Sequence, residues 1–280
     1  DGRPAPDANE EYRLYQILLG AWPADDADPD EIFRGRMKEH WQKAVNEAKR
    51  NTSWVSPNEP WLKAGERFLD AILEPTSGRQ FLESFRPKAR RLARLGMVNS
   101  LAQVVLKITS PGVPDFYQGT ELWDFSLVDP DNRRPVDFES RQRLAEEAER
   151  TNWRTLLAQW EDGAIKLRLT RALLKYRGTN AELFRSGEYQ PLEVRGRFAE
   201  NVVAYSRNGD GRRVVIVVPR LTSTLGCPPL GLVWDDTAVV MPGEAARWKD
   251  VLTGREVLED GVVALADLFW ELPLAVLETT

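Results

Sequence analysis

The stretch "NVVAYSRNGDGRRVVIVVPRL", Asn201–Leu221, marks the point at which the chain changes its hydrophobic period. Two runs rich in valine flank Asn-Gly-Asp-Gly, a composition typical of the tight turn between two antiparallel strands. We therefore predict a β-hairpin here.

Short apolar runs, separated by glycine or proline, follow this hairpin towards the end of the chain. They are "TAVVM" (237–241), "RWKDVLTG" (247–254), "REVLEDGVVAL" (255–265) and "LAVLE" (274–278). Several short strands at such spacing are typical of a sandwich or an open barrel. We predict a small antiparallel β-sandwich domain over residues 186–280.

The sequence before residue 186 has apolar residues at every third or fourth position, which is the period of a helix. Helices are expected over 11–22, 31–50, 61–72, 141–160 and 164–177. Another should end near Phe85, because Pro87 removes a backbone donor, and a long helix should then run to Ile108. The predicted fold class is α+β, with a helical region over 1–185 and the β domain over 186–280.

The composition excludes several classes of function. The 280 residues contain one cysteine, Cys227, and one histidine, His40, which rules out an intramolecular disulfide and argues against a histidine-rich metal site. The net charge of -5 provides no basic surface for nucleic acid. No run approaches the roughly 20 apolar residues that cross a bilayer. We expect no cofactor, metal, membrane or nucleic-acid partner, and a cytoplasmic location.

Ten tryptophans stand out in the composition. A buried indole packs in a core, whereas an exposed one can stack on the C–H face of a pyranose ring. Trp54 in "NTSWVSPNE" and Trp123 in "TELW" are candidates for stacking on a sugar. Core packing is the alternative for each.

A second informative segment lies between the predicted helices, around residues 113–137. Val113–Tyr117 is a short apolar run bounded by turn residues, which favours a buried strand. The polar stretch after it is longer than a plain connector requires. In a (β/α) barrel the ligand lies at the carboxyl ends of the strands, where Tyr117, Gln118 and Glu121 would stand.

The stretch "LVDPDNRRPVDF", residues 127–138, combines carboxylates with guanidinium groups. Carboxylates accept hydrogen bonds from sugar hydroxyls, and guanidinium groups donate in a fixed fork. The candidate substrate-binding residues here are Asp129, Asp131, Arg133 and Arg134. In one alternative these residues pair with one another in an exposed turn, where ion pairs contribute little. In another, the arginines brace the loop through Asp129 or Asp137.

These residues also resemble a known family. The stretch "SPGVPDFYQGTELWDFSLVDPDNRRPVDF", Ser110–Phe138, is similar to maltooligosyl trehalose synthases of the α-amylase superfamily. Further similar stretches are 9–23, 48–59, 90–112, 162–174 and 248–255, in the order of the C-terminal part of that family. The resemblance covers nearly the whole chain. One departure is Asn51, where the resemblance leads us to expect histidine.

The resemblance implies an enzyme that rearranges a glycosidic bond, a (1->4)-alpha-D-glucan 1-alpha-D-glucosylmutase. Such an enzyme converts the reducing-end α-1,4 bond of a maltooligosaccharide to an α,α-1,1 bond. Its superfamily works with retention, which requires paired carboxylates. No stretch here matches the motifs that carry them, so we expect no catalytic residue in this chain.

The resemblance therefore implies a C-terminal portion that is inactive alone. It would hold the last strand of a (β/α)8 barrel, the helices around it and the β domain. Its expected partners are the maltooligosaccharide substrate and the N-terminal catalytic part of the same enzyme.

Two alternatives stay open from the residues themselves. The chain could be a non-catalytic module that binds glucan or serves as a scaffold, which the β domain alone would fit. It could also be part of a related hydrolase of the same superfamily. Sequence upstream of residue 1 discriminates between them, because carboxylate-bearing strand ends there would favour an enzyme.

Overall fold

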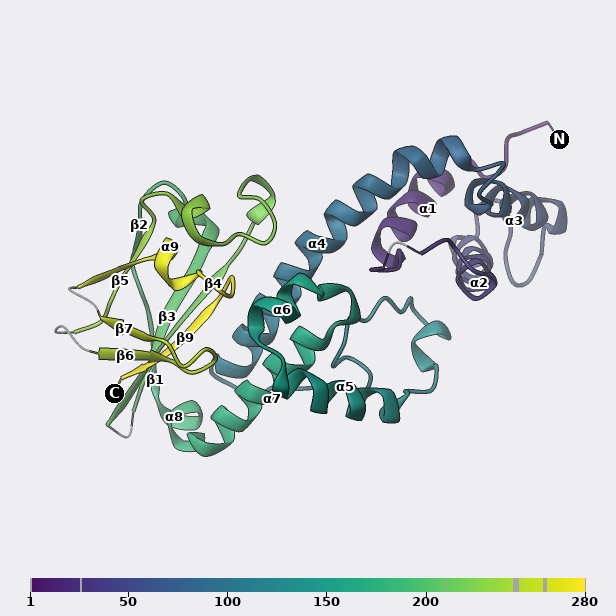
Figure 1. Ribbon diagram of the computed structural model, residues 1–280. Helices are drawn as coiled ribbons and strands as arrows, with labels where there is room; N and C mark the ends of the chain where they lie inside the picture. Colours follow the sequence, from purple (N-terminus) through teal and green to yellow (C-terminus); the bar gives the residue numbers. More distant parts are fainter. Residues whose placement is uncertain (1, 26, 210, 244–246, 259–260, 280) are drawn as a thin grey trace. The chain divides into compact units, whose positions relative to one another are not determined.

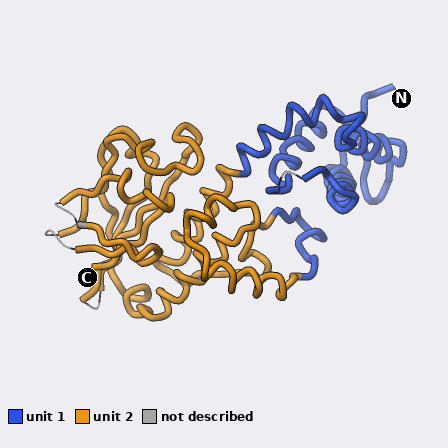
Figure 2. Tube along the Cα trace, in the orientation of Figure 1, with its two compact units in different colours: residues 1–93, 125–135 blue, residues 94–124, 136–280 orange. Residues whose placement is uncertain are grey.

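The computed structural model describes residues 2–25, 27–209, 211–243, 247–258 and 261–279 (Figure 1). Its chain divides into two compact units (Figure 2). The first unit holds residues 1–93 and 125–135, and the second holds residues 94–124 and 136–280. The change from helices to strands falls where the hydrophobic period changes, between α8 (Ala181–Ser186) and β1 (Glu188–Pro191).

The first unit consists of α1 (Ala8–Ala21), α2 (Glu31–Ala48), α3 (Glu59–Leu73) and the start of α4 (Arg79–Thr109), together with the 125–135 segment. The first three helices begin where a polar side chain accepts backbone N–H groups, at Asp7, Asp30 and Asn58. Their apolar faces share one core, which includes Leu18, Trp22, Met37, Trp41, Leu69 and Leu73. The apolar residues that predicted these helices from the sequence therefore form the core of this unit.

Helix α4 continues through Pro87, so the predicted break at this residue is wrong. A proline inside a helix costs about 3 kcal/mol, because one backbone hydrogen bond is lost. Pro87 is exposed, whereas Leu82, Phe85 and Ala89 around it are buried in the core of the first unit. Burial of this face keeps the helix intact across the proline.

The second unit has these helices before its β domain: the rest of α4, α5 (Phe138–Arg150), α6 (Trp153–Ala158), α7 (Ala164–Thr179) and α8. The single helix expected over 141–160 is in fact α5 and α6. Asn152 caps α6 by accepting the Thr155 N–H at 2.8 Å, and this cap replaces continuation of α5. Gly163, with φ +75°, then separates α6 from α7, as expected.

The predicted hairpin is confirmed. Strands β3 (Val202–Gly209) and β4 (Arg212–Pro219) pair antiparallel along their whole length, with Tyr205 opposite Ile216. Asp210, in the turn, lies outside the described residues. The hairpin belongs to a six-stranded sheet of order β1-β3-β4-β9-β6-β7. Its other strands are β6 (Arg247–Asp250), β7 (Glu256–Leu258) and β9 (Ala275–Thr279).

A three-stranded sheet of order β2-β5-β8 completes the β domain. Its strands are β2 (Val194–Arg195), β5 (Ala238–Val240) and β8 (Val262–Ala264), with the short helix α9 (Leu265–Leu268) after β8. Side chains of both sheets fill one core, which includes Val215, Val217, Trp248, Val239 and Val263. All pairings between the described strands are antiparallel, and the two sheets share one core, as the predicted sandwich requires.

Short 3₁₀ turns lie between these elements: η1 (Asp131–Arg133), η2 (Trp160–Asp162), η3 (Ala199–Asn201), η4 (Thr222–Thr224) and η5 (Gly231–Trp234). Across the described ranges, no helix is both long enough and apolar enough to cross a membrane.

Arg207 on β3 joins the sheet to the ends of α4 and α8. Its guanidinium is buried and donates to the carbonyls of Thr109, Leu183, Phe184 and Gly187 at 2.9 to 3.3 Å. The last carbonyls of a helix have no partner inside it. One side chain therefore satisfies the carboxyl ends of two helices.

Val113–Tyr117 is not a strand, so the buried strand predicted there is wrong. The side chain of Val113 is 94% exposed and that of Tyr117 is 73% exposed. A strand requires a neighbouring strand that accepts and donates its backbone bonds, and no described strand lies beside this run. The barrel to which the run was assigned is not formed by the described residues.

Candidate functional site

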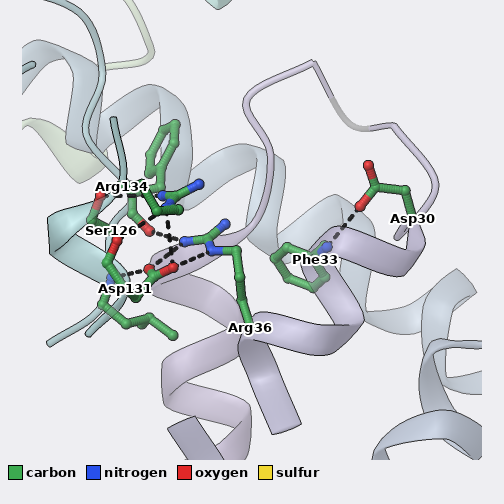
Figure 3. A network of polar contacts seen from close by, with 8 residues as sticks. Asp30, Phe33, Arg36, Ser126, Asp131 and Arg134 are labelled. Atoms are coloured by element: carbon green, nitrogen blue, oxygen red, sulfur yellow. Dashed lines mark hydrogen bonds and ion pairs between the residues drawn. The ribbon is translucent and has the colours of Figure 1, made fainter. Parts of the chain in front are cut away.

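Asp131 is the centre of a polar network in the first unit (Figure 3). Its carboxylate accepts from Arg36, at 2.8 Å from Nε and 2.9 Å from Nη2, and from the Leu127 N–H at 2.6 Å. Arg134 Nε lies 3.2 Å from the same carboxylate. The side chain of Asp131 is 9% exposed. Its oxygens are therefore largely occupied by bonds within the protein.

The protonation state of Asp131 follows from these contacts. Burial alone would raise its pKa, but the bonds from Arg36 and from the Leu127 N–H outweigh burial and hold the pKa below its usual range. The carboxylate is ionised at neutral pH and can only accept hydrogen bonds. Asp131 is therefore suited to position its neighbours and unsuited to donate a proton.

One face of α2 supplies the cations that hold the 125–135 segment. Arg36 and Lys43 stand seven residues apart, and their side chains donate to the carbonyls of Phe125 at 2.8 Å and Asp129 at 2.6 Å. Sequence reasoning missed both residues. The available signal was a pair of cations spaced by two helical turns on the polar face of an amphipathic helix.

His40 lies on the same face of α2, between these cations. Its Nε2 is 2.9 Å from Nη2 of Arg13. Burial, followed by the charges of Arg13 and Lys43, lowers the pKa of His40, so the ring is neutral at pH 7. The neutral ring accepts from Arg13, which indicates a structural role.

Two arginines of the 125–135 segment stay exposed while they pair locally. Arg133 donates to Asp129 from Nε at 3.2 Å and from Nη2 at 2.5 Å, and this pairing lowers the pKa of Asp129. Arg134 donates to the Asp131 carbonyl at 3.0 Å and to the Ser126 hydroxyl at 3.3 Å. The local pairing left open by the sequence is thus present, and both guanidinium groups are also open to solvent.

In the second unit, Glu121 organises the residues that follow Tyr117. Its carboxylate accepts from the Gly119 N–H and from Arg141 Nε, both at 3.0 Å. Arg141 also donates to the Gly119 carbonyl at 3.1 Å. Tyr117 and Gln118 are exposed beside this turn. Arg141, which sequence reasoning missed, therefore braces the turn from α5.

The two candidate tryptophans differ in their surroundings. Trp123 Nε1 donates to the Trp160 carbonyl at 2.6 Å, and the Lys166 ammonium lies 5.8 Å from the Trp123 ring. Trp54, in the first unit, is 59% exposed. The buried tryptophans are Trp22, Trp41, Trp61, Trp153, Trp160, Trp234 and Trp248. Most of the tryptophan side chains therefore pack in the interior, which was the alternative to stacking on sugar.

Asn51, the departure from the family pattern, has a structural role. Its Nδ2 donates to Asp7 at 3.0 Å and to Glu10 at 3.1 Å, at the start of α1. These two acids also form the capping box of α1. The amide therefore ties the loop after α2 to the start of α1.

The structure assembles the nine candidates unequally. Asp129, Asp131, Arg133 and Arg134 lie together against α2, and Glu121 and Trp123 are each anchored within the second unit. Trp54 lies in the loop between α2 and α3. Contact of any of them with sugar stays a prediction. Across the residues that the structure describes, no three His, Cys, Asp or Glu side chains are grouped to hold a metal ion.

Comparison with known proteins gives one consistent result. Putative maltooligosyl trehalose synthases of two Mycobacterium tuberculosis strains, CDC 1551 / Oshkosh and H37Rv, are 34% identical over 274 residues, which cover 98% of this chain and 32% of theirs. The solved maltooligosyltrehalose synthase from Arthrobacter ramosus is 33% identical, with a TM-score of 0.75 over 96% of this chain and 32% of that chain. No family model matches the chain.

A further crystal structure of a maltooligosyl trehalose synthase is 31% identical, with a TM-score of 0.74, over 97% of this chain and 33% of that one. This chain thus spans about a third of the length of the relatives it matches. The sequence match and the structural match each cover nearly the whole chain, so both include residues of the two compact units. They confirm the resemblance read from the sequence, which is to the C-terminal portion of the maltooligosyl trehalose synthases.

Proposed function

We propose that this chain is the C-terminal part of an intramolecular transglucosylase. The parent enzyme would convert the reducing-end α-1,4 bond of a maltooligosaccharide to an α,α-1,1 bond and so form maltooligosyl trehalose. The observation that carries this proposal is the 34% identity over 98% of the chain with proteins named putative maltooligosyl trehalose synthase. This match extends through the helices and the β domain, so both belong to the same enzyme.

The 125–135 segment is proposed to hold sugar hydroxyls. Arg133 and Arg134 are exposed, and each guanidinium has more N–H groups than its local bonds use. Asp131 and Arg36 keep the backbone of the segment in one position. A segment that is ordered before the ligand arrives loses less conformational freedom on binding.

Retention of the released glucose is the chemical requirement of such a mutase. Glucose must stay in the site, turn, and attack with its anomeric hydroxyl before water does. Tyr117 and Trp123 offer aromatic faces for stacking, and the bond from Trp123 to the Trp160 carbonyl limits rotation of the indole. Trp54 is the third aromatic side chain in this proposal.

The catalytic carboxylates are proposed to lie outside this chain, upstream in the parent enzyme. A retaining pair stands about 5 Å apart, with one member acting as nucleophile and the other as acid and base. The partly buried carboxylates of the candidate segments are already ion-paired, Asp131 with Arg36 and Glu121 with Arg141. This supports a role in binding and positioning.

The test compares the parent enzyme with this chain alone, using maltopentaose as the substrate. The parent should remove the reducing end without releasing stoichiometric glucose, and the chain alone should convert nothing. Glucose and short maltooligosaccharides as main products would favour a hydrolase. Saturable binding of maltopentaose without conversion by the parent would favour a glucan-binding module. Turnover by this chain alone would show that it contains the catalytic carboxylates.

A further inference from the structure

A pocket of about 250 Å³ opens in the second unit, and none of the candidate sugar residues lines it. Its apolar wall is formed by Met97, Leu157, Ala158, Trp160, Pro228 and Leu230. Two arginines, Arg94 and Arg154, and the thiol of Cys227 complete the lining. The pocket therefore combines a hydrocarbon surface with positive charge.

Two buried donors belong to residues of this lining. Nε of Arg94 and Nε1 of Trp160 are inaccessible to solvent, and neither has a hydrogen-bond partner in the described part of the chain. The Trp160 side chain is almost fully buried. Because neither nitrogen is open to solvent, a ligand oxygen does not reach them. The donors available to a ligand are the other N–H groups of the Arg94 guanidinium and the exposed guanidinium of Arg154.

The charge of the lining favours an anionic ligand. Among the described residues that line the pocket, none is an aspartate or a glutamate. The Arg154 guanidinium lies 5.6 Å from the centre of the Trp270 ring, a cation–π contact that restrains it beside the pocket. A carboxylate is the simplest group that accepts from a guanidinium fork and compensates its charge.

The wall and the volume limit the rest of the ligand. A sugar requires many convergent polar groups, which this wall lacks. Pockets for drug-sized ligands begin at about 300 Å³, so this one suits a smaller body. A bicyclic aromatic ring or a short acyl chain has the appropriate size and covers apolar side chains.

We propose that this pocket binds a small apolar carboxylate. Its hydrocarbon body packs on Met97, Leu157 and Leu230, and its carboxylate accepts from the guanidinium groups of Arg94 and Arg154. The site is separate from the proposed glucan site and does not depend on the transglucosylase assignment.

Titration calorimetry of the 280-residue chain with 2-naphthoate tests the proposal, with neutral 2-naphthol as the control ligand. We expect one saturable site for naphthoate, at least tenfold tighter than for naphthol. Arg94→Gln should weaken naphthoate at least tenfold and leave naphthol unchanged. Arg90→Gln, at an exposed position on the same helix outside the lining, is the matched control and should change neither.

A filling variant and a chemical reporter locate the site independently. Ala158 is exposed at the pocket, so Ala158→Trp should fill the space, leave the circular dichroism spectrum unchanged and abolish binding of both ligands. Cys227 is the only cysteine of the chain, and burial raises the pKa of its thiol. Naphthoate should slow its alkylation by iodoacetamide at mildly alkaline pH.

Three results would overturn the proposal. They are no saturable naphthoate binding, equal binding of naphthol, or naphthoate binding that is insensitive to both the Arg94 and the Ala158 variants. None of these measurements depends on conversion of maltopentaose, so a negative result would leave the proposed function untouched.

Discussion

The hairpin at 202–219 and the run at 113–117 were both predicted to form strands, but only the hairpin does so. Both are apolar and bounded by turn residues. The hairpin strand β4 is paired on both sides, with β3 and β9, and Val214–Val218 are fully buried. Val113 and Tyr117 are exposed and unpaired with any described strand. An apolar run thus becomes a strand only where another strand offers its backbone.

Side chains replace strand pairing in the region from 112 to 129. Its carbonyls accept from cations on neighbouring helices of the same unit. In the second unit the donors are Lys107 to Asp115 at 3.0 Å, Arg177 to Gly112 at 2.6 Å, Arg141 to Gly119 at 3.1 Å and Lys166 to Leu122 at 2.9 Å. Arg36 and Lys43 do the same in the first unit. Single side chains therefore position this region, and single substitutions should release parts of it.

The largest expected effect is the loss of unfolding free energy when the buried hairpin strand β4 is changed. Val217→Asp places a charge in the sandwich core and should reduce the free energy of unfolding by about 4 kcal/mol or more. Val113→Asp, at an exposed position, should stay within about 0.5 kcal/mol of the wild type. Urea unfolding followed by circular dichroism measures both. Equal losses would show that the 113–117 run is also buried.

The next effect concerns a buried carboxylate in the same sheet as the hairpin. Burial raises the pKa of Asp250 from its ordinary value of 3.8 to about 6. The folded state therefore holds the proton more tightly than the unfolded state. The stability from protonated Asp250 is fully present below about pH 4 and is lost as the pH rises through about 6.

Asp250→Asn should remove this pH dependence. The asparagine oxygen can still accept the Leu252 and Thr253 N–H groups, so the turn is kept. Between pH 4 and pH 8 the wild type should lose about 2 to 3 kcal/mol more unfolding free energy than the variant. Asp267→Asn, at an exposed site in the same domain, serves as the control. Identical pH profiles for wild type and Asp250→Asn would refute the assigned pKa.

A smaller effect is expected where side chains replace strand pairing. Arg36→Gln removes the two bonds to Asp131 and leaves that carboxylate with less compensation, at a cost of about 2 kcal/mol. The 125–135 segment should then be cut faster by protease in the folded protein. Arg79→Gln, which breaks an exposed pair with Glu83, should change neither the rate of cleavage in the 125–135 segment nor the free energy of unfolding. An uncut segment in Arg36→Gln would show that backbone bonds suffice to hold it.

The smallest effect on stability separates binding from folding within the same segment. Arg133 pairs with Asp129 in solvent, so Arg133→Gln should leave the unfolding midpoint unchanged. In the parent enzyme the substitution should weaken the binding of maltopentaose about tenfold if Arg133 donates to the sugar. Arg143→Gln, which breaks the exposed pair with Glu139 on α5, is the matched control. Unchanged affinity in Arg133→Gln would leave this residue with a local pairing role only.

Local patterns predicted much of the architecture. The turn chemistry between β3 and β4, the helical period before residue 186 and Gly163 after η2 were readable because each depends on near neighbours. The predictions at Pro87 and over 141–160 were wrong, since burial around the proline and the cap at Asn152 decided those helix boundaries. The candidate cluster of acids and arginines was visible, whereas its supports Arg36 and Lys43 were not, because they lie about 90 residues away in the sequence.

The sequence by itself determined the α+β class, the antiparallel sandwich and the family resemblance. These depend on periodicity, turn residues and motifs, which are properties of neighbouring residues. Only the tertiary structure decided that 113–117 is unpaired, that Asp131 is enclosed by Arg36, and that Arg94 and Trp160 line one pocket. Pairing, burial and pocket formation depend on which distant segments meet, and no local pattern contains that information.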